Sequence, residues 1–216
     1  MKRKIFGAIL IGLGVAMLLA ALGIGGYYLW VQERAGEQAE QVMDTLLQQI
    51  TTAPSADEPE QTIPEDTPNQ TPDIFLPEEK PDPLRPMPTV EIDGVAYIGY
   101  VELPTLGLTL PVIEESTKAN LNIAPCRFYG TVYQNNLVIG GHRYSRHFAQ
   151  INTLGYGQPI QFTDAEGNVY IYEVTECEVI EAYEAEYLCS GDWDLSLYTC
   201  TPGGRSRVVV RCVRIP

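Results

Sequence analysis

The chain has 216 residues, of which 45% are hydrophobic and 19% are charged, and its formal net charge is −14 at pH 7. That length suits one ordinary domain with appendages. A nucleic-acid-binding surface needs clustered lysine and arginine, and the sequence has 14 basic residues against 28 acidic ones without such a cluster. We therefore expect no nucleic-acid partner. The uneven distribution of apolar residues argues against a single cytosolic globule.

A membrane-spanning helix is predicted at the N-terminus. Residues 1–4 form a basic cytoplasmic tail, and the next 27 residues, 5–31, carry no charge. At about 1.5 Å per helical residue, this exceeds the ~30 Å hydrocarbon core of a bilayer. A cleaved signal peptide, with an apolar region of only about 7–15 residues, is the alternative. Because basic residues mark the cytoplasmic side, we expect a single-pass cell-membrane anchor followed by an extracellular domain.

Residues 32–89 are expected to be an extracytoplasmic acidic, proline-rich linker. Ten of the 16 prolines fall between Pro54 and Pro88, and this composition favours disorder. As extended polyproline II, at about 3.1 Å per residue, it would hold a domain roughly 100 Å from the membrane. Asp82–Leu84 is a candidate lid over the domain, although a plain linker is the preferred interpretation.

The linker is expected to begin as a helix, because apolar residues recur there on one helical face. They are Ala39, Met43, Leu46 and Ile50. This segment would extend the membrane helix outward, either as a solvated stub, which is favoured, or as a short coiled seam between two copies.

The pattern from 90 to 216 predicts a mainly β domain. Short apolar runs bounded by Gly, Pro, Asn and Asp predict strands at 95–103, 108–113, 136–141, 158–163, 168–180, 194–201 and 206–215. Glu166–Asn168 is a predicted hairpin turn. A helix is predicted over Ser145–Leu154, with Ser145 as its cap. Seven to eight short strands with one or two short helices favour a closed β-barrel.

The candidate nucleophile is Cys200. Five cysteines are present, and an odd number in an exported chain leaves at least one unpaired. Strand alternation turns Cys200 away from the face of Leu195 and Leu197, next to a Pro-Gly-Gly turn. Arg205 and Arg207 follow and can return beside the thiol, where a guanidinium would stabilise developing negative charge. Cys212, by contrast, alternates with valines and is expected to be buried.

The candidate base is His142, because a nucleophilic thiol needs a neighbouring base and only one other histidine, His147, is present. His142 ends an apolar strand behind Gly140 and Gly141, which would leave room for a substrate backbone. His147 is expected at the surface. Alone, His142 and Cys200 are each explained more simply as structural residues, and their combination with an arginine favours a catalytic site.

Three motifs together resemble the sortase family. Asn136-Leu-Val-Ile-Gly-Gly-His142-Arg143 is similar to its V-I-A-G-H-R histidine strand, Leu197-Tyr-Thr-Cys200-Thr-Pro202 to its L-x-T-C-T-P nucleophile motif, and Arg207-Val-Val-Val to its R-x-x-V strand. The resemblance covers about residues 90–216 and implies a sortase-like barrel with His142, Cys200 and Arg207 as catalytic residues. The short interval to Arg207 departs from many sortases and leaves Arg205 as a competitor. The subclass is open and looks closest to class B or D.

The resemblance implies a cysteine transpeptidase that cleaves an LPxTG-like C-terminal sorting signal of surface proteins through a thioester. The acceptor would be an amine of a peptidoglycan precursor or of a pilin. Five residues are expected to bind the signal, namely Thr199, Thr201, Tyr187, Leu188 and Trp193. No metal and no cofactor are expected, and calcium at Glu181, Glu184 and Glu186 is not favoured.

Three competing hypotheses were weighed against this one. An L,D-transpeptidase would place His and Gly directly before the cysteine, where Tyr198 and Thr199 stand here. A papain-like hydrolase would place its cysteine before its histidine, which is the reverse of this order. A catalytically silent wall-binding or scaffold domain is the third alternative.

Overall fold

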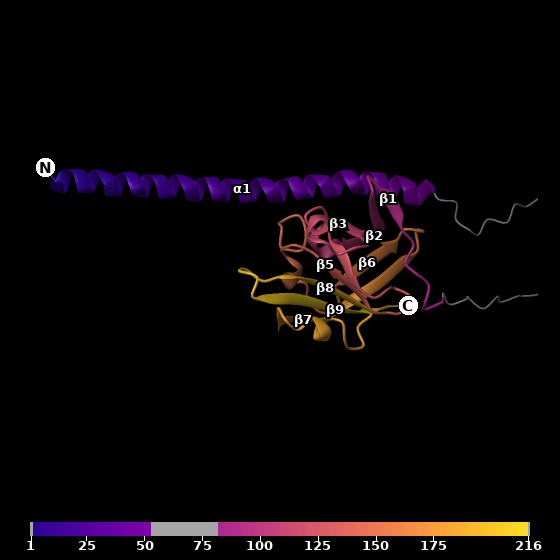
Figure 1. Ribbon diagram of the computed structural model, residues 1–216. Helices are drawn as coiled ribbons and strands as arrows, with labels where there is room; N and C mark the ends of the chain where they lie inside the picture. Colours follow the sequence, from indigo (N-terminus) through magenta and orange to yellow (C-terminus); the bar gives the residue numbers. More distant parts are fainter. Residues whose placement is uncertain (1, 53–81, 216) are drawn as a thin grey trace, which may run out of the picture.

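The computed structural model describes residues 2–52 and 82–215 and shows a long helix lying along a β-barrel (Figure 1). The helix α1 spans Lys2–Thr52 without interruption. Among the described residues, one helical stretch is long and apolar enough to cross a membrane, and it lies within Ile11–Thr51 of α1. The other helical elements are short: the α-helices α2 (Lys118–Leu121) and α3 (Ala185–Leu188), and the 3-10 helices η1 (Pro104–Leu106) and η2 (Ile151–Thr153).

Nine strands form one sheet. They are β1 (Val90–Ile92), β2 (Val95–Leu103), β3 (Leu108–Ile113), β4 (Cys126–Tyr129), β5 (Leu137–Gly140), β6 (Pro159–Asp164), β7 (Val169–Glu181), β8 (Leu195–Cys200) and β9 (Ser206–Arg214). Their order is β1-β2-β3-β4-β5-β8-β9-β7-β6, and β2 also pairs with β6. That last pairing closes β2–β9 into an eight-stranded barrel, with β1 outside it. The predicted closed β-barrel of seven to eight strands is confirmed.

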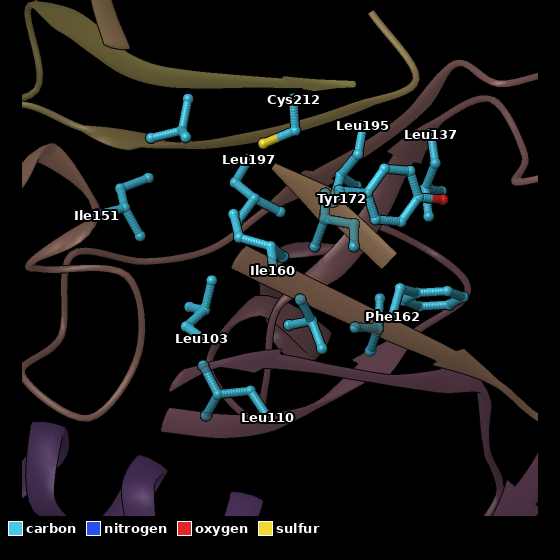
Figure 2. Close-up of a cluster of buried hydrophobic side chains, with 14 of the residues drawn as sticks. Leu103, Leu110, Leu137, Ile151, Ile160, Phe162, Tyr172, Leu195, Leu197 and Cys212 are labelled. Atoms are coloured by element: carbon cyan, nitrogen blue, oxygen red, sulfur yellow. The ribbon is translucent and has the colours of Figure 1, made fainter. Parts of the chain in front are cut away.

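The barrel interior is the main hydrophobic core. Inward-facing residues from β2, β6, β7, β8 and β9 meet there, as Figure 2 shows for Leu103, Phe162, Tyr172, Leu197 and Cys212. Cys212 has no exposed surface, and burial raises the pKa of its thiol. Its predicted role as a small buried hydrophobe is confirmed.

The predicted helix over Ser145–Leu154 is wrong. The segment consists of turns, in which the Phe148 amide donates to the His142 carbonyl at 3.2 Å, followed by the single 3-10 turn η2. Phe148, Ile151 and Leu154 are buried in the main core as the pattern suggested. Closing the end of the barrel with these side chains overrides the weak helical propensity of the segment.

The second part of α1 packs against the outside of the barrel. Met43 and Leu46 join a buried cluster with Ile92, Tyr97 and Ile113 from β1, β2 and β3, and Leu46 has 0% exposed surface. The expectation that this part of the helix is surrounded by solvent is therefore wrong. The alternative, a coiled seam between two copies, is also wrong for the face that carries Met43 and Leu46. The helical periodicity was predicted correctly, but its partner is the chain's own barrel.

The expected separation of domain and membrane anchor is not observed either. Arg146, in the loop after β5, forms ion pairs with Glu33, at 3.1 Å, and with Glu40 on α1. The barrel is thus held beside the helix directly after the apolar stretch 5–31. Most of the predicted extended linker, residues 53–81, lies outside the described residues.

Asp82–Leu84 forms a turn at the end of the barrel remote from Cys200. The Asp82 carboxylate accepts the Leu84 amide at 2.9 Å, and the next residue, Arg85, pairs with Glu166 in the β6–β7 turn and lies over the Tyr133 ring. Glu166 precedes β7, whereas Ile180 at the other end of β7 is level with the Cys200–Arg207 pair. This turn is therefore not a lid over Cys200.

All five cysteines are free thiols, so no disulfide accounts for the extra ones. Cys126 is buried in the cluster beneath α1 and its thiol donates to the Ala124 carbonyl at 3.4 Å. Burial raises its pKa to about 12. Cys177 is exposed, and Cys189 and Cys200 are partly exposed.

Candidate active site

Three strands bring His142, Cys200 and Arg207 into one row. In the parallel pair β5–β8, each residue pairs with the one 58 positions later, from Leu137 with Leu195 to Gly140 with Tyr198. The same offset separates His142 from Cys200, so the two residues lie level, just beyond the last pair. On the other side, Cys200 pairs directly with Arg207 of β9. Continued along the chain, this backbone register brings His142 and Arg207 to the level of Cys200 from the two sides of β8.

Hydrogen bonds fix the two strand ends that carry His142 and Cys200. The Gly141 amide donates to the Tyr198 carbonyl at 3.0 Å, and the buried Thr199 hydroxyl donates to the Gly141 carbonyl at 2.8 Å. Gly141 directly precedes His142, and Tyr198 and Thr199 are the two residues before Cys200. These hydrogen bonds fix the backbone next to His142 and Cys200 in the absence of substrate.

The glycines before His142 make room for protein side chains. A Cβ on Gly140 would lie 2.5 Å from the Tyr198 ring, and one on Gly141 would lie 2.7 Å from the Phe148 ring. The expectation that they leave space for a substrate backbone is wrong. Their function is to let two rings pack tightly around the site.

The geometry separates Arg207 from its competitor. Arg207 is level with Cys200, and its guanidinium donates to the carbonyls of Gly204 and Ser206, each at 3.1 Å. Arg205 lies exposed in the turn before β9 and pairs with no residue of β8. Arg207 is the better candidate to face a substrate bound at the thiol.

His142 is half-buried and stacks beside Tyr144, with the ring centroids 4.9 Å apart. Burial lowers the pKa of His142, and the positive charge of Lys118 lowers it further. Both causes favour the neutral imidazole, the form that accepts a proton from a thiol.

His147 is fully buried, which contradicts its expected surface position. Neither of its ring nitrogens has a hydrogen-bond partner among the described residues. Burial lowers its pKa to about 4, while the Ala35 backbone, which approaches the ring without a hydrogen bond of ordinary geometry, opposes that shift. His147 therefore belongs to the packing between α1 and the barrel and not to the catalytic row.

A pocket of about 230 Å³ opens beside Arg207. Its apolar lining includes Phe128 of β4, Ile180 of β7, Leu188 of α3 and Tyr198 of β8. The Phe128 and Tyr198 rings meet edge to face at 5.4 Å. Arg207, Glu181 and Glu184 supply the charged part of the lining. A mostly apolar pocket that also contains a guanidinium is suited to an apolar side chain next to a polar carbonyl.

The expected signal-binding residues are only partly brought together. Leu188 lines the pocket, but Tyr187 is half-exposed and donates its hydroxyl to Glu178 at 3.1 Å. Trp193 packs against Gly191, outside the pocket lining. The Thr199 and Thr201 side chains are engaged by the protein itself, through Gly141 and Ser206 respectively.

The sequence interpretation missed Tyr198, Phe128 and Ile180 as pocket residues. Tyr198 had a signal, since it alternates onto the same face of β8 as Cys200. Phe128 had none, because β4 was not predicted. Among residues 2–52 and 82–215, no three His, Cys, Asp or Glu side chains gather as metal ligands, and the expectation of no cofactor stays a prediction.

The sequence model of the sortase domain matches residues 101–215, from β2 to β9, including all three residues of the row. The chain belongs to the sortase family. It is 29% identical over 128 residues to sortase A of Bacillus anthracis, a match that covers 56% of this chain and 60% of that protein. The chain thus spans less than two thirds of this curated relative.

Solved sortase structures share the fold. The barrel resembles sortase C of Streptococcus pneumoniae at 26% identity and a TM-score of 0.50, covering 56% of this chain and 67% of that one. A lid mutant of sortase A from Corynebacterium diphtheriae is 25% identical with a TM-score of 0.51, covering 56% and 72%. Both sortase A and sortase C thus stand among these neighbours, so the subclass stays open.

Proposed function

We propose that this sortase is a membrane-anchored cysteine transpeptidase acting on an LPxTG-like C-terminal sorting signal. The observation that carries the proposal is the row of His142, Cys200 and Arg207 on β5, β8 and β9. Membership of the sortase family supports the same chemistry. The substrates are surface proteins that bear such a signal.

In the first half-reaction, the Cys200 thiolate attacks the carbonyl carbon of the Thr–Gly peptide bond. The negative charge on the carbonyl oxygen is stabilised by the guanidinium of Arg207. The C–N bond then breaks, His142 gives its proton to the leaving amine, and a thioester remains on Cys200.

In the second half-reaction, an amine attacks the thioester carbon and a new amide bond forms. His142 takes the proton of the attacking amine, and the sulfur leaves as thiolate. The acceptor is an amine of a peptidoglycan precursor or of a pilin; the Streptococcus pneumoniae neighbour is described in terms of pilin substrate specificity. Because the thioester retains the energy of the cleaved amide, the ligation needs no nucleoside triphosphate outside the membrane.

The signal peptide is held by the pocket beside Arg207. Tyr198, Phe128 and Leu188 supply an apolar wall for its leucine and proline side chains, while Arg207 at the edge binds a backbone carbonyl. The α3 segment, which joins β7 to β8, covers one side of this pocket.

The apolar part of α1 anchors the enzyme in the cell membrane. The basic residues at positions 2–4 stand on the cytoplasmic side, and the barrel stands outside. This topology exposes the site to exported substrates.

The test uses the full chain in lipid nanodiscs, because removal of α1 would uncover the cluster around Leu46. Incubation with an LPxTG peptide should add the mass of the acyl fragment to Cys200, and hydroxylamine should release it. Cys200→Ala should abolish the adduct, and His142→Gln and Arg207→Gln should each reduce its rate by at least about 10²-fold. Cys177→Ala, which removes another exposed thiol, is the matched control and should retain full activity.

Two results would contradict the proposal. A panel of LPxTG-like peptides that yields no adduct would favour a silent scaffold. Acylation by a peptidoglycan peptide alone would favour an L,D-transpeptidase.

A further inference from the structure

The docked helix gives the barrel a fixed direction relative to the membrane anchor. Near the N-terminal end of the docked segment, Arg146 in the loop after β5 pairs with Glu33 and Glu40. Near its C-terminal end, Ile50 lies against Gly167 in the β6–β7 turn, where an added Cβ would lie 3.4 Å from the Ile50 side chain. Glu33 and Ile50 are about 25 Å apart along a helix. The barrel therefore lies lengthwise along α1.

The catalytic row is at the end of the barrel nearer the apolar span. His142 lies four residues before Arg146, in the same loop, and its neighbour Tyr144 has its pKa raised by burial and by the nearby Tyr28 of α1. Gly167, in contrast, is at the far end of the barrel, beside the start of β7. Figure 1 shows the same polarity, with the β8–β9 turn directed toward the N-terminal part of α1 and the C-terminus at the opposite end.

The distance to the bilayer surface follows from helical geometry. The uncharged stretch ends at Val31, and Glu33 lies only about 3 Å further along the helix axis. Tyr27, Tyr28 and Trp30 stand at this boundary, and the Tyr27 ring lies beside the other two. Such aromatic side chains prefer the headgroup region. The loop that carries His142 therefore meets α1 at the level where the helix leaves the membrane.

Exposed basic side chains occur at this same end, beside the exposed acidic side chains of Glu115, Glu181 and Glu186. Lys118 acts electrostatically on His142, Arg143 follows His142 in the chain, and Arg205 lies in the turn after Cys200. All three are exposed. Lysine and arginine at a membrane surface are attracted to anionic headgroups.

We propose that α1 holds the catalytic end of the barrel against the phospholipid headgroups on the extracellular surface of the cell membrane. The enzyme would thereby select polypeptides that are tethered to the same membrane. The proposal rests on the membrane anchoring proposed above. The active site would then have a fixed height above the membrane, in place of the variable height that a long extended spacer would give. A tethered substrate then reaches Cys200 at a high effective concentration, and a soluble peptide does not.

The first experiment measures the height of each barrel end in vesicles that contain anionic lipid. The full chain, with Cys177, Cys189 and Cys200 replaced by alanine, receives one fluorescent label at Ser145→Cys, at the catalytic end, or at Gln134→Cys, at the far end. Lipids with a quencher on the headgroup should quench the Ser145 label strongly and the Gln134 label weakly. Equal quenching at both positions would overturn the proposal.

The second experiment releases the barrel from α1. Leu46 is buried beneath the helix, whereas its neighbour Leu47 is 39% exposed on another face. Leu46→Asp should remove most of the quenching at Ser145, and Leu47→Asp should leave it unchanged. Circular dichroism checks that the barrel remains folded in both variants. If Leu46→Asp unfolds the chain, the double variant Glu33→Gln/Glu40→Gln weakens the contact between α1 and the barrel with less disruption.

The third experiment compares substrates with the same sequence. The enzyme with all its cysteines should cleave a lipid-tethered LPxTG peptide at least about 10-fold faster than the free peptide at equal bulk concentration. Leu46→Asp should lose this preference while retaining cleavage of the free peptide. Vesicle flotation tests the anchor and the Cys200 adduct tests the chemistry, so failure of either is distinguishable from failure of the orientation.

Discussion

The Thr199 hydroxyl donates to the Gly141 carbonyl at 2.8 Å and so joins β8 to the end of β5, one residue before Cys200 and one before His142. Both partners are buried. The bond therefore connects the strand of the proposed nucleophile with the segment of the proposed base inside the barrel. It also explains why Thr199 is not free to contact a substrate.

Thr199→Val should weaken both stability and catalysis. The substitution keeps the side-chain shape and leaves the Gly141 carbonyl without its hydroxyl partner, which costs about 1–3 kcal/mol of unfolding free energy. The acylation rate should fall because the His142 loop is less well fixed. Urea denaturation and adduct kinetics measure the two effects.

Thr163→Val is the matched control. Thr163 is also buried, but its hydroxyl has no hydrogen-bond partner among the described residues. This variant should be as stable as the parent or slightly more stable. If the two valine variants lose equal stability, the Thr199–Gly141 bond has no special role.

The strands were predictable because most are short apolar or β-branched runs bounded by Gly, Pro, Asn or Asp. β2 and β3 occupy the predicted ranges 95–103 and 108–113. β1 and β4 were missed because they are short and polar residues interrupt them, so neither forms an apolar run. The loop after β5 was mistaken for a helix because Phe148, Ile151 and Leu154 have helical spacing, although turns bury them equally well.

The positions of His142, Cys200 and Arg207 at one level of the sheet agree with the motifs, and their catalytic roles stay a proposal. The surroundings of this row were not predictable. Cys200 and His142 each follow an apolar run, and their combination with an arginine in three sortase-like motifs singled them out. The partner of the Leu46 face was not predictable, because periodicity reveals an apolar face but not what covers it. The burial of His147 has the same cause, since it depends on α1 packing over a loop more than 90 residues away in sequence.

Arg211 should control substrate affinity through the α3 segment. Its side chain is 1% exposed and pairs with Glu178 at 2.9 Å. It also donates to the carbonyls of Leu188, at 2.8 Å, and Tyr187, at 3.2 Å. Arg211→Lys removes the planar fork that makes these contacts together. The KM for a signal peptide should rise severalfold, with a smaller change in kcat.

A structural role alone would make a different prediction for Arg211. If the guanidinium only stabilises the fold, Arg211→Lys should lower the melting temperature and leave KM unchanged. Glu178→Gln is the control, because its amide oxygen can still accept the Arg211 hydrogen bond and α3 stays in place.

His147 should make the docking of α1 sensitive to acid. Burial lowers its pKa from 6.5 to about 4, so the folded state binds this proton less readily than the unfolded state. The stability that His147 contributes is fully present above about pH 6.5 and is lost as the pH falls toward 4. The steepest loss is about 1.4 kcal/mol per pH unit.

Thermal melts of the parent and of His147→Phe between pH 7 and pH 4 measure this effect. The phenyl ring fills the same space and does not titrate, so the variant should lose less stability in acid. Neighbouring His142 and Arg146 also disfavour the protonated ring, and they remain in both proteins. Parallel pH profiles would show that His147 is not the responsible group.

Lys118 should contribute to the lowered pKa of His142, the proposed base. Burial is the larger cause of the lowered His142 pKa, and the Lys118 charge is the second. Lys118→Gln removes that charge, so the His142 pKa should rise and imidazolium should persist to higher pH. The limb of the acylation pH profile that reports His142 should move in the same direction.

Nuclear magnetic resonance can test this directly, because the chain has only two histidines. His147→Phe assigns the remaining imidazole signal to His142, and its titration in the presence and absence of Lys118→Gln gives the shift. Arg214→Gln, which removes an exposed charge at the far end of β9, is the control and should leave the titration unchanged. An unchanged His142 pKa in Lys118→Gln would mean that burial alone lowers it. Lys118→Gln and Arg214→Gln would then also have the same pH profile for acylation.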